Sequence, residues 1–391
     1  APTKEELQEK AKKEQVENKA KEVKTVTSTI AAAPMADSSQ IAVAQAALGS
    51  FGYSATLPSA KDNFTEIKND LLSLKISNKG GYIVEATVLG FEQFEKNSKK
   101  AVQLIKENNA SLNITLNTTD NRSLQTKEMF FEPKLSKEGE NQVLTMQLKA
   151  GPEQFLEYRY VLKPNDYMLD FGIRSQGLEK VINTSKPLDL EWQLKTFRNE
   201  KSISYENRYT ELVFEYEDGK DDYLNAAKDS EDDVIDLTYV AFKQHLFTSI
   251  LLTDTKFKTA KVKSFNLVKD EKIDTVYTKN FVAQLPLEFK NGAINYNMNW
   301  YYGPSNYKIL NDYKRNLDEI VPLGWGIFGW INRFIFIPVF GFIAGIGVGY
   351  GMAIVLFTIL VRIVMSPVTY KSYLSQAKMK VLRPEITELN E

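Results

Sequence analysis

The sequence has no cysteine, a single histidine and almost no net charge. Its 391 residues include 49 lysines and arginines against 50 aspartates and glutamates. Without cysteine, the chain can form neither disulfides nor zinc–thiolate clusters, and it has no thiol nucleophile. The single histidine, His245, excludes most histidine-based metal sites and catalytic triads. The balanced charge gives no general attraction to DNA. We therefore expect no metal, no cofactor and no nucleic-acid partner.

Apolar residues are distributed unevenly along the chain. Residues 1–320 are polar to mixed, whereas residues 323–370 are strongly apolar, which is the profile of a water-soluble part joined to a membrane part. The first 24 residues hold seven lysines and six glutamates, and the following residues to position 60 are rich in alanine, serine and threonine. Such segments bury too little surface to offset their ordering entropy. Residues 1–60 are therefore predicted to be a flexible linker.

Residues 61–312 have the pattern of a large β-domain. Apolar and polar residues alternate in LLSLKIS (71–77), FLEYRYVLK (155–163) and LDLEWQL (188–194), as in strands with one buried face. Turn residues separate these runs, and Asn291-Gly292 predicts a hairpin between LPLEFK and AINYNMNWYY. Many short strands over this length predict a mainly β fold with one large sandwich.

A first apolar helix is expected at residues 324–343. Trp325, Trp330 and Arg333 stand among phenylalanines and isoleucines, and Pro338 should interrupt the helix. Tryptophan and arginine beside an apolar face are typical of an amphipathic helix on a membrane surface. The segment is thus predicted to lie on the periplasmic face of the bilayer, with these three residues as interface anchors.

A second apolar helix, residues 350–370, follows a glycine-rich turn and is long enough to cross a bilayer. Segment 371–391 then carries four basic residues: Lys371, Lys378, Lys380 and Arg383. Positive charge marks the cytoplasmic side. The β-domain is therefore expected in the periplasm of a two-membrane bacterium, with a first membrane anchor upstream of Ala1. Segment 371–391 is expected to begin a cytoplasmic helical hairpin.

Arg362 is the single charge in an apolar run of 37 residues. It precedes Lys371 by nine residues, roughly 13 Å along a helix, which is close to the middle of a hydrocarbon core of about 30 Å. An arginine at that depth costs about 2.5–3.5 kcal/mol on insertion scales. Thr358 and Ser366 lie four residues to either side and share its helical face. Three explanations stay open: the side chain snorkels to headgroups, pairs with a carboxylate of another helix, or faces a water-filled groove.

Four stretches of the sequence carry a family resemblance. They are ISNKGGYIVEATVLGF (76–91), LTYVAFKQHLFTSILL (237–252), YYGPSNYKIL (301–310) and VLFTILVRIVMSPVTYKSYLSQAKMKVLRPEI (355–386). The last is the most specific, with the pattern T-x-x-V-R, then P-[LV]-T, K-S and M-x-x-L-x-P. Through these stretches, the chain from about residue 65 to 391 resembles the YidC branch of the YidC/Oxa/Alb family of membrane protein insertases, in its long Gram-negative form.

The resemblance implies a periplasmic β-supersandwich, an interfacial amphipathic helix and a transmembrane helix. It also implies an inner-membrane protein, multi-pass in full length, that is an insertase and chaperone and not an enzyme. Arg362, with Thr358 and Ser366, would line a hydrophilic groove open to the cytoplasm. The implied partners are nascent membrane proteins, the lipid bilayer, the Sec translocon (SecYEG and SecDF) and the translating ribosome. Because family members have further transmembrane helices, this chain is expected to be an N-terminal portion.

Two other functions are alternatives. The β-domain could be a docking scaffold for Sec components, a role compatible with insertion. It could also be a carbohydrate-binding or mutarotase-like sandwich, which would need a general acid and base. His245 lies among apolar residues in AFKQHLFTS and is expected to be structural. The acidic segment 215–233 lacks the regular spacing and closing glutamate of an EF-hand loop, so it is expected to be a solvated insertion loop.

Overall fold

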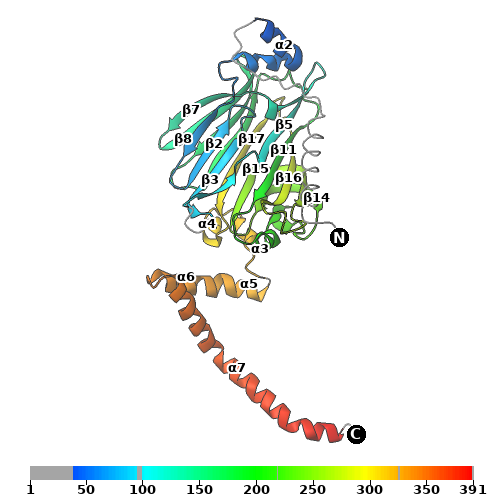
Figure 1. Cartoon of the computed structure of the whole chain (residues 1–391). Coiled ribbons are helices and arrows are strands. Elements are labelled where there is room, and N and C mark those ends of the chain that lie inside the picture. Colours follow the sequence, from blue (N-terminus) through cyan, green and yellow to red (C-terminus); the bar gives the residue numbers. More distant parts are fainter. Residues whose placement is uncertain (1–37, 95–98, 218, 325, 390–391) are drawn as a thin grey trace, which may run out of the picture. The chain divides into compact units, whose positions relative to one another are not determined.

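The alternating residues form two antiparallel sheets (Figure 1). The computed structural model describes residues 38–94, 99–217, 219–324 and 326–389. The smaller sheet has four strands in the order β1-β2-β3-β4. The larger has thirteen, and its main path runs β6-β5-β11-β16-β15-β17-β10-β9-β8-β7, with β12, β13 and β14 joined beside β15. The predicted mainly β sandwich is confirmed.

The strands of the smaller sheet are β1 (Phe64–Lys68), β2 (Leu72–Ser77), β3 (Ile83–Glu92) and β4 (Ala101–Ile105). The larger sheet contains β5 (Ala110–Asn117), β6 (Ser123–Gln125), β7 (Glu132–Glu138), β8 (Asn141–Gly151), β9 (Gln154–Leu162), β10 (Met168–Gln176), β11 (Leu188–Phe197), β12 (Glu211–Tyr216), β13 (Lys220–Tyr223), β14 (Ser230–Lys243), β15 (Phe247–Asn266), β16 (Tyr277–Leu287) and β17 (Asn295–Pro304). A short 3-10 turn, η2 (Thr126–Glu128), follows β6.

Large aromatic side chains fill the core of the sandwich. Trp192 of β11 stacks on Phe242 of β14, with ring centroids 3.7 Å apart, and meets Trp300 of β17 edge-on. Phe171 of β10 stacks on Tyr160 of β9. Rings of this size bury roughly 150–250 Å² each and contribute much of the stability of such a core. The strands predicted from alternation place their apolar residues on this inner face.

The hairpin predicted at Asn291-Gly292 is only partly correct. Both residues have positive φ, 54° and 79°, and Lys290 bridges Ala293, as in a tight two-residue turn. However, β16 and β17 do not pair with each other; each pairs with β15 instead. The two ends of this 20-residue strand take different partners: its first part pairs with β17 and its last part with β16.

The acidic segment 215–233 is not an insertion loop. It includes the end of β12, the whole of β13 and the first residues of β14, all within the larger sheet. All four side chains of β13 are exposed, which explains why the segment has the composition of a loop. A strand at the margin of a sheet can carry charges on an exposed face without losing its backbone pairing.

The flexible-linker prediction is wrong for residues 38–60. This segment forms α2 (Ser38–Leu48) and the 3-10 helix η1 (Gly49–Thr56), and η1 packs against β8. Phe51 is completely buried. The packing depends on small residues, since a Cβ on Gly52 would lie 2.7 Å from the Cα of Gln45. Residues 1–37, the rest of the predicted linker, lie outside the described residues.

The two ends of the sandwich differ. One end carries α2 and η1, and the other carries α3 (Ile203–Arg208) and α4 (Tyr307–Asp312) (Figure 1). The chain leaves the domain at this second end, through α4 and the 3-10 turn η3 (Leu317–Ile320). We call it the exit end. Its connections are fixed by hydrogen bonds, including Ser305 N–H to Leu246 O at 2.8 Å and the Tyr313 hydroxyl to Asp166 Oδ1 at 2.6 Å.

A second compact unit begins at Val321. It contains α5 (Ile327–Ile331), the π-helical turn η4 (Asn332–Phe336), α6 (Ile337–Gly345) and α7 (Tyr350–Leu389). Gly347 and Gly349, both with positive φ, form the turn before α7. Two helical runs, Ile327–Gly345 and Tyr350–Lys380, are long and apolar enough to cross a membrane. Most of their apolar side chains are exposed, and helices that are apolar all round are typical of a lipid environment.

Candidate functional site

Arg362 lies on the exposed surface of α7. Its neighbours Ile359 and Ile363 are also exposed, so the guanidinium stands in an apolar surrounding. Among the residues that the structure describes, it makes no hydrogen bond or ion pair. A guanidinium presents five donors and stays charged. In a bilayer it would therefore need water, lipid phosphate or another acceptor. The hydrated groove stays a prediction.

The hydroxyl groups beside Arg362 are used within the helix. Thr358 Oγ1 donates to Ile354 O, and Ser366 Oγ donates to Ile363 O, both at 2.8 Å. The second bond has a specific cause. Pro367 has no N–H, so the carbonyl of Ile363, four residues earlier, loses its usual helical donor. The Ser366 hydroxyl replaces that donor. Ser366 therefore has a structural role that its assignment to a groove did not anticipate.

An aromatic contact sets the geometry between α6 and α7. The ring of Phe357 on α7 meets Phe336 and Phe340 edge-on, with centroids 5.4 Å and 5.8 Å away. Ala353, one turn earlier on α7, is completely buried. A small residue at a helix crossing allows close backbone approach, which is how helices associate in lipid. The two apolar helices therefore form a packed pair.

The predicted surface anchors are placed as follows. Trp330 on α5 is 55% exposed and its ring packs against Phe334, with centroids 5.7 Å apart. Arg333 is only half-exposed, within the π-helical turn. Trp325 lies outside the described residues. Whether these residues meet a membrane surface stays a prediction.

The prediction that Pro338 interrupts the helix is wrong. The helical run continues from Ile327 to Gly345, and the π-helical turn η4 ends at Phe336, two residues before this proline. Pro338 cannot donate to the carbonyl of Phe334, so a normal α-helical turn would leave that carbonyl without a donor. A turn with wider hydrogen-bond spacing accommodates the missing donor and lets the helix continue.

The basic residues after position 370 lie on the same helix as Arg362. Lys371, Lys378 and Lys380 are exposed on α7; Arg383 also belongs to α7, with its side chain outside the described residues. No break separates the predicted span 350–370 from segment 371–389. A 40-residue helix is about 60 Å long, twice a hydrocarbon core, so part of it would extend beyond the bilayer.

His245 has a charged partner and aromatic neighbours. Its Nδ1 lies 2.6 Å from Glu200 Oε1, and its ring packs against Tyr209 and Tyr205, with centroids 4.8 Å and 5.3 Å away. These partners precede His245 by 36 to 45 residues, so the sequence alone could not identify them. A partnered, half-buried histidine of this kind is consistent with the expected structural role.

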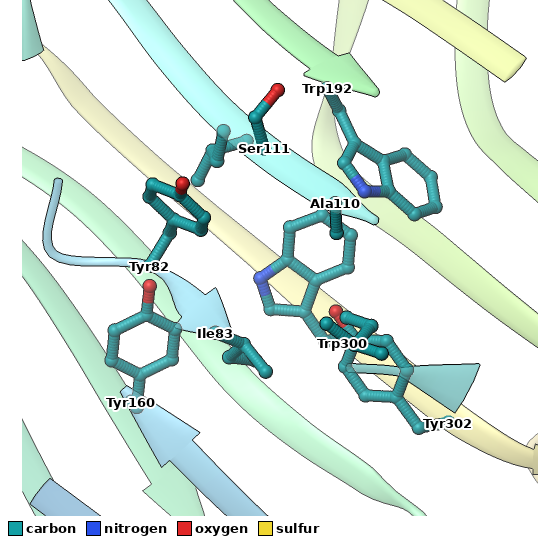
Figure 2. A pocket seen from close by; sticks show the side chains of 10 residues that line it. Tyr82, Ile83, Ala110, Ser111, Tyr160, Trp192, Trp300 and Tyr302 are labelled. Atoms are coloured by element: carbon teal, nitrogen blue, oxygen red, sulfur yellow. The ribbon is translucent and has the colours of Figure 1, made fainter. Parts of the chain in front are cut away.

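A small aromatic pocket lies in the core. Figure 2 shows Tyr82, Tyr160, Trp192, Trp300 and Tyr302 around it. Its free space is about 10 Å³, on the order of a single water molecule. Most of the lining side chains are buried. The pocket is therefore a gap in core packing and is too small for a saccharide.

A larger, polar hollow lies on the outer face of the larger sheet, with a volume of about 330 Å³. Gly172 lines this hollow together with Arg159 and Asn297, the residues paired with it on the neighbouring strands. Its carboxylates are already paired: Asp170 with Lys163 at 3.0 Å, and Asp254 with Arg315 at 3.2 Å. The hollow also lacks the histidine that a mutarotase-type acid–base site usually needs.

Two family models match the chain. The model of the YidC periplasmic domain matches residues 65–338, which is most of the sequence. The chain belongs to the YidC family. The model of the 60Kd inner membrane protein matches residues 342–391, the segment that contains α7 and Arg362. The sandwich and the apolar helices thus follow one another in the order that the YidC resemblance predicted.

Curated relatives agree with this membership in the YidC family. A membrane protein insertase YidC from Bacteroides fragilis is 34% identical over 347 residues, covering 86% of this chain and 54% of the relative. Another from Parabacteroides distasonis is 32% identical over 351 residues, covering 87% of this chain and 54% of the relative. The chain therefore spans about half the length of these curated relatives.

Solved structures show more distant likenesses. The crystal structure of YidC from Thermotoga maritima has a TM-score of 0.38 and 12% identity, covering 84% of this chain and 78% of that one. A putative aldose 1-epimerase from Escherichia coli K12 has a TM-score of 0.37 and 10% identity, covering 61% of this chain and 98% of that one. At these values, neither likeness assigns a function.

Proposed function

We propose that this chain is part of a membrane protein insertase of the inner membrane: its periplasmic domain, an interfacial helix and a transmembrane helix. Membership in the YidC family supports the proposal, as do the two apolar helices. The observation that carries it is Arg362, an exposed guanidinium without a partner among the described residues on an otherwise apolar helix. Such a costly charge is retained where it serves a pathway through the membrane.

The proposed mechanism is electrostatic and breaks no covalent bond, so the protein is not an enzyme. Arg362 lies in a water-filled groove open to the cytoplasm, where the low dielectric around it strengthens its attraction for acidic residues of an incoming protein. Polar segments then cross part of the bilayer in contact with water and the guanidinium. The hydroxyl groups of Thr358 and Ser366 donate to the helix backbone, and their oxygens keep lone pairs that can accept hydrogen bonds from water.

The membrane arrangement follows from the distribution of anchors. The α5–α6 run lies on the periplasmic surface, with Trp325 and Trp330 at the headgroup level and Arg333 near phosphate. α7 crosses the bilayer and enters the cytoplasm at Lys371. Packing of Phe357 between Phe336 and Phe340 supports a fixed angle between the surface helix and the span.

The partners in this proposal are nascent membrane proteins and lipids. In the whole protein they also include the Sec translocon, with SecYEG and SecDF, and the translating ribosome. The β-domain could then have a second role as a docking scaffold for Sec components.

The proposal is tested by substituting Arg362 in the whole protein. Arg362→Ala should reduce insertion of substrates with acidic translocated tails several-fold, whereas Arg362→Lys should keep much of the activity because it retains the charge. Lys378→Ala, on the exposed part of α7 outside the proposed span, is the control and should insert normally. If Arg362→Ala inserts as well as the control at equal protein level, the guanidinium is not part of an insertion pathway.

A further inference from the structure

An exposed aromatic patch lies at the exit end of the β-domain. We define the exit-end patch as Phe91, Phe94, Tyr205, Tyr209, His245 and Leu246. Leu246 is 52% exposed and Tyr205 is 46% exposed. Both phenylalanines are more than one third exposed. Large apolar side chains that gather on a surface mark an interaction site, whereas isolated ones do not.

The patch is continuous across the turn between β14 and β15. On one side of this turn, Phe91 meets Phe247 edge-on, with ring centroids 5.3 Å apart. On the other side, His245 packs against Tyr205 and Tyr209. Residues from β3, α3 and the turn, which are far apart in sequence, therefore form one surface.

Buried hydrogen bonds hold this surface in place. The Glu206 carboxylate accepts from the backbone N–H groups of Asn199 and Glu200 at 2.9 Å and 3.0 Å, and from Gln244 Nε2 at 3.1 Å. Gln244 Nε2 also donates to Phe197 O at 2.6 Å. These bonds tie the loop before α3 to the turn that carries Leu246. The patch is thus preformed, and little conformational entropy would be lost when it binds.

Basic side chains accompany the aromatic ones. The guanidinium of Arg198 lies 4.8 Å from the ring centre of Phe94. Lys201, before α3, and Arg208, the last residue of α3, are exposed. Glu200 lies among them, with its Oε1 2.6 Å from His245 Nδ1. Amphipathic rings beside cations are the composition of surfaces that meet a bilayer at its headgroup layer.

The length of the connecting chain favours a lipid partner. Six residues separate Ile320, at the end of the β-domain, from Ile327, at the start of α5. Fully extended, this connection spans about 25 Å at most. If α5 to α7 are in the bilayer, as in the proposed function on which this inference rests, the exit end cannot move far from the membrane surface. We propose that the exit-end patch docks onto phospholipid headgroups of the periplasmic leaflet.

The test uses single cysteines, because this chain has none of its own. Leu246→Cys and Phe94→Cys each carry a polarity-sensitive NBD dye in the chain reconstituted into vesicles of phosphatidylcholine and phosphatidylglycerol. Leu135→Cys on β7 and Phe64→Cys on β1 are matched controls. Leu135 is 53% exposed, and Phe64 is 52% exposed with Lys75 over its ring, as Arg198 lies over Phe94. Leu356→Cys on α7 reports membrane insertion itself.

We expect blue-shifted emission and at least a two-fold greater quenching by headgroup-labelled lipid at positions 246 and 94 than at positions 135 and 64. Removing phosphatidylglycerol should weaken the signal, because the patch is partly basic. Quenching at position 356 with none at 246 and 94 would overturn the docking proposal and leave the membrane assignment intact. Emission at 246 that shifts only when membrane proteins are added would also overturn it, in favour of a protein partner. Absence of quenching at 356 would refute the proposed function itself.

Discussion

Glu206 should make the stability of the β-domain depend on pH. Burial raises the pKa of this carboxyl from 4.5 to about 7, against the opposing effect of its backbone N–H donors. The folded domain then keeps the proton up to about pH 7, whereas the unfolded chain releases it near pH 4.5. The contribution of Glu206 to stability is therefore fully present below pH 4.5 and is lost as the pH rises through 7. A shift of this size corresponds to about 3 kcal/mol at most.

The measurement is chemical denaturation of the chain at pH 5 and pH 8, for the wild type and for Glu206→Gln. The wild type should lose up to about 3 kcal/mol of unfolding free energy between these values, and the variant should lose much less, because its amide does not titrate. Glu66→Gln, at an exposed position of β1, should keep the wild-type pH dependence. Lys279, whose pKa burial lowers to about 8, is charged in both states through most of this window and adds little to the difference.

Equal pH slopes for the wild type and Glu206→Gln would refute this reasoning. Such a result would mean that the carboxylate stays ionised in the folded domain, with the N–H groups of Asn199 and Glu200 and the Gln244 amide outweighing the cost of burial.

Three further predictions test other parts of the structure. Phe51→Ala should lower the unfolding free energy by about 3 kcal/mol because the side chain is completely buried, while Val43→Ala on the exposed face of α2 should change it little; equal effects in denaturation would contradict the packing of this segment. Ser366→Ala should cost about 1 kcal/mol in lipid. In a Pro367→Ala background it should cost almost nothing, because residue 367 then supplies the N–H; a double-mutant cycle on thermal unfolding measures the difference. Spin labels along 327–345 should show shallow depth with helical periodicity; uniform mid-bilayer depth would show that this helix spans the membrane.

The strands could be predicted from the sequence, but their order could not. Alternation in 188–194 is a local signal, and these residues do form part of β11. The pairing of β15 with both β16 and β17 depends on contacts between residues far apart in the chain, which no local turn signal contains. Residues 38–60 are predicted to be a linker from their content of alanine, serine and threonine. Alanine and glycine instead stabilise this segment by allowing close packing around Phe51.

The candidate site also has features that could be predicted from the sequence and others that could not. Arg362 could be found because one charge in an apolar run is conspicuous. The role of Ser366 could also have been inferred, since a serine directly before Pro367 can bond the carbonyl that the proline leaves without a donor. The exit-end patch could not be predicted, because it brings together β3, α3 and the β14–β15 turn. The π-helical turn before Pro338 could not be predicted, because a proline within a helix usually ends or kinks it.

The hydration of Arg362 is the central claim, and cysteine accessibility tests it most directly. Arg362→Cys, Val364→Cys and Ser372→Cys would each be placed in the whole protein, with any other cysteine replaced, and treated with a membrane-impermeant maleimide from the cytoplasmic side. Val364 is exposed on the opposite face of α7, where lipid is expected. If Arg362 faces a water-filled groove, positions 362 and 372 should react and position 364 should not. If 362 is as inert as 364 while 372 reacts, Arg362 does not face a water-filled groove.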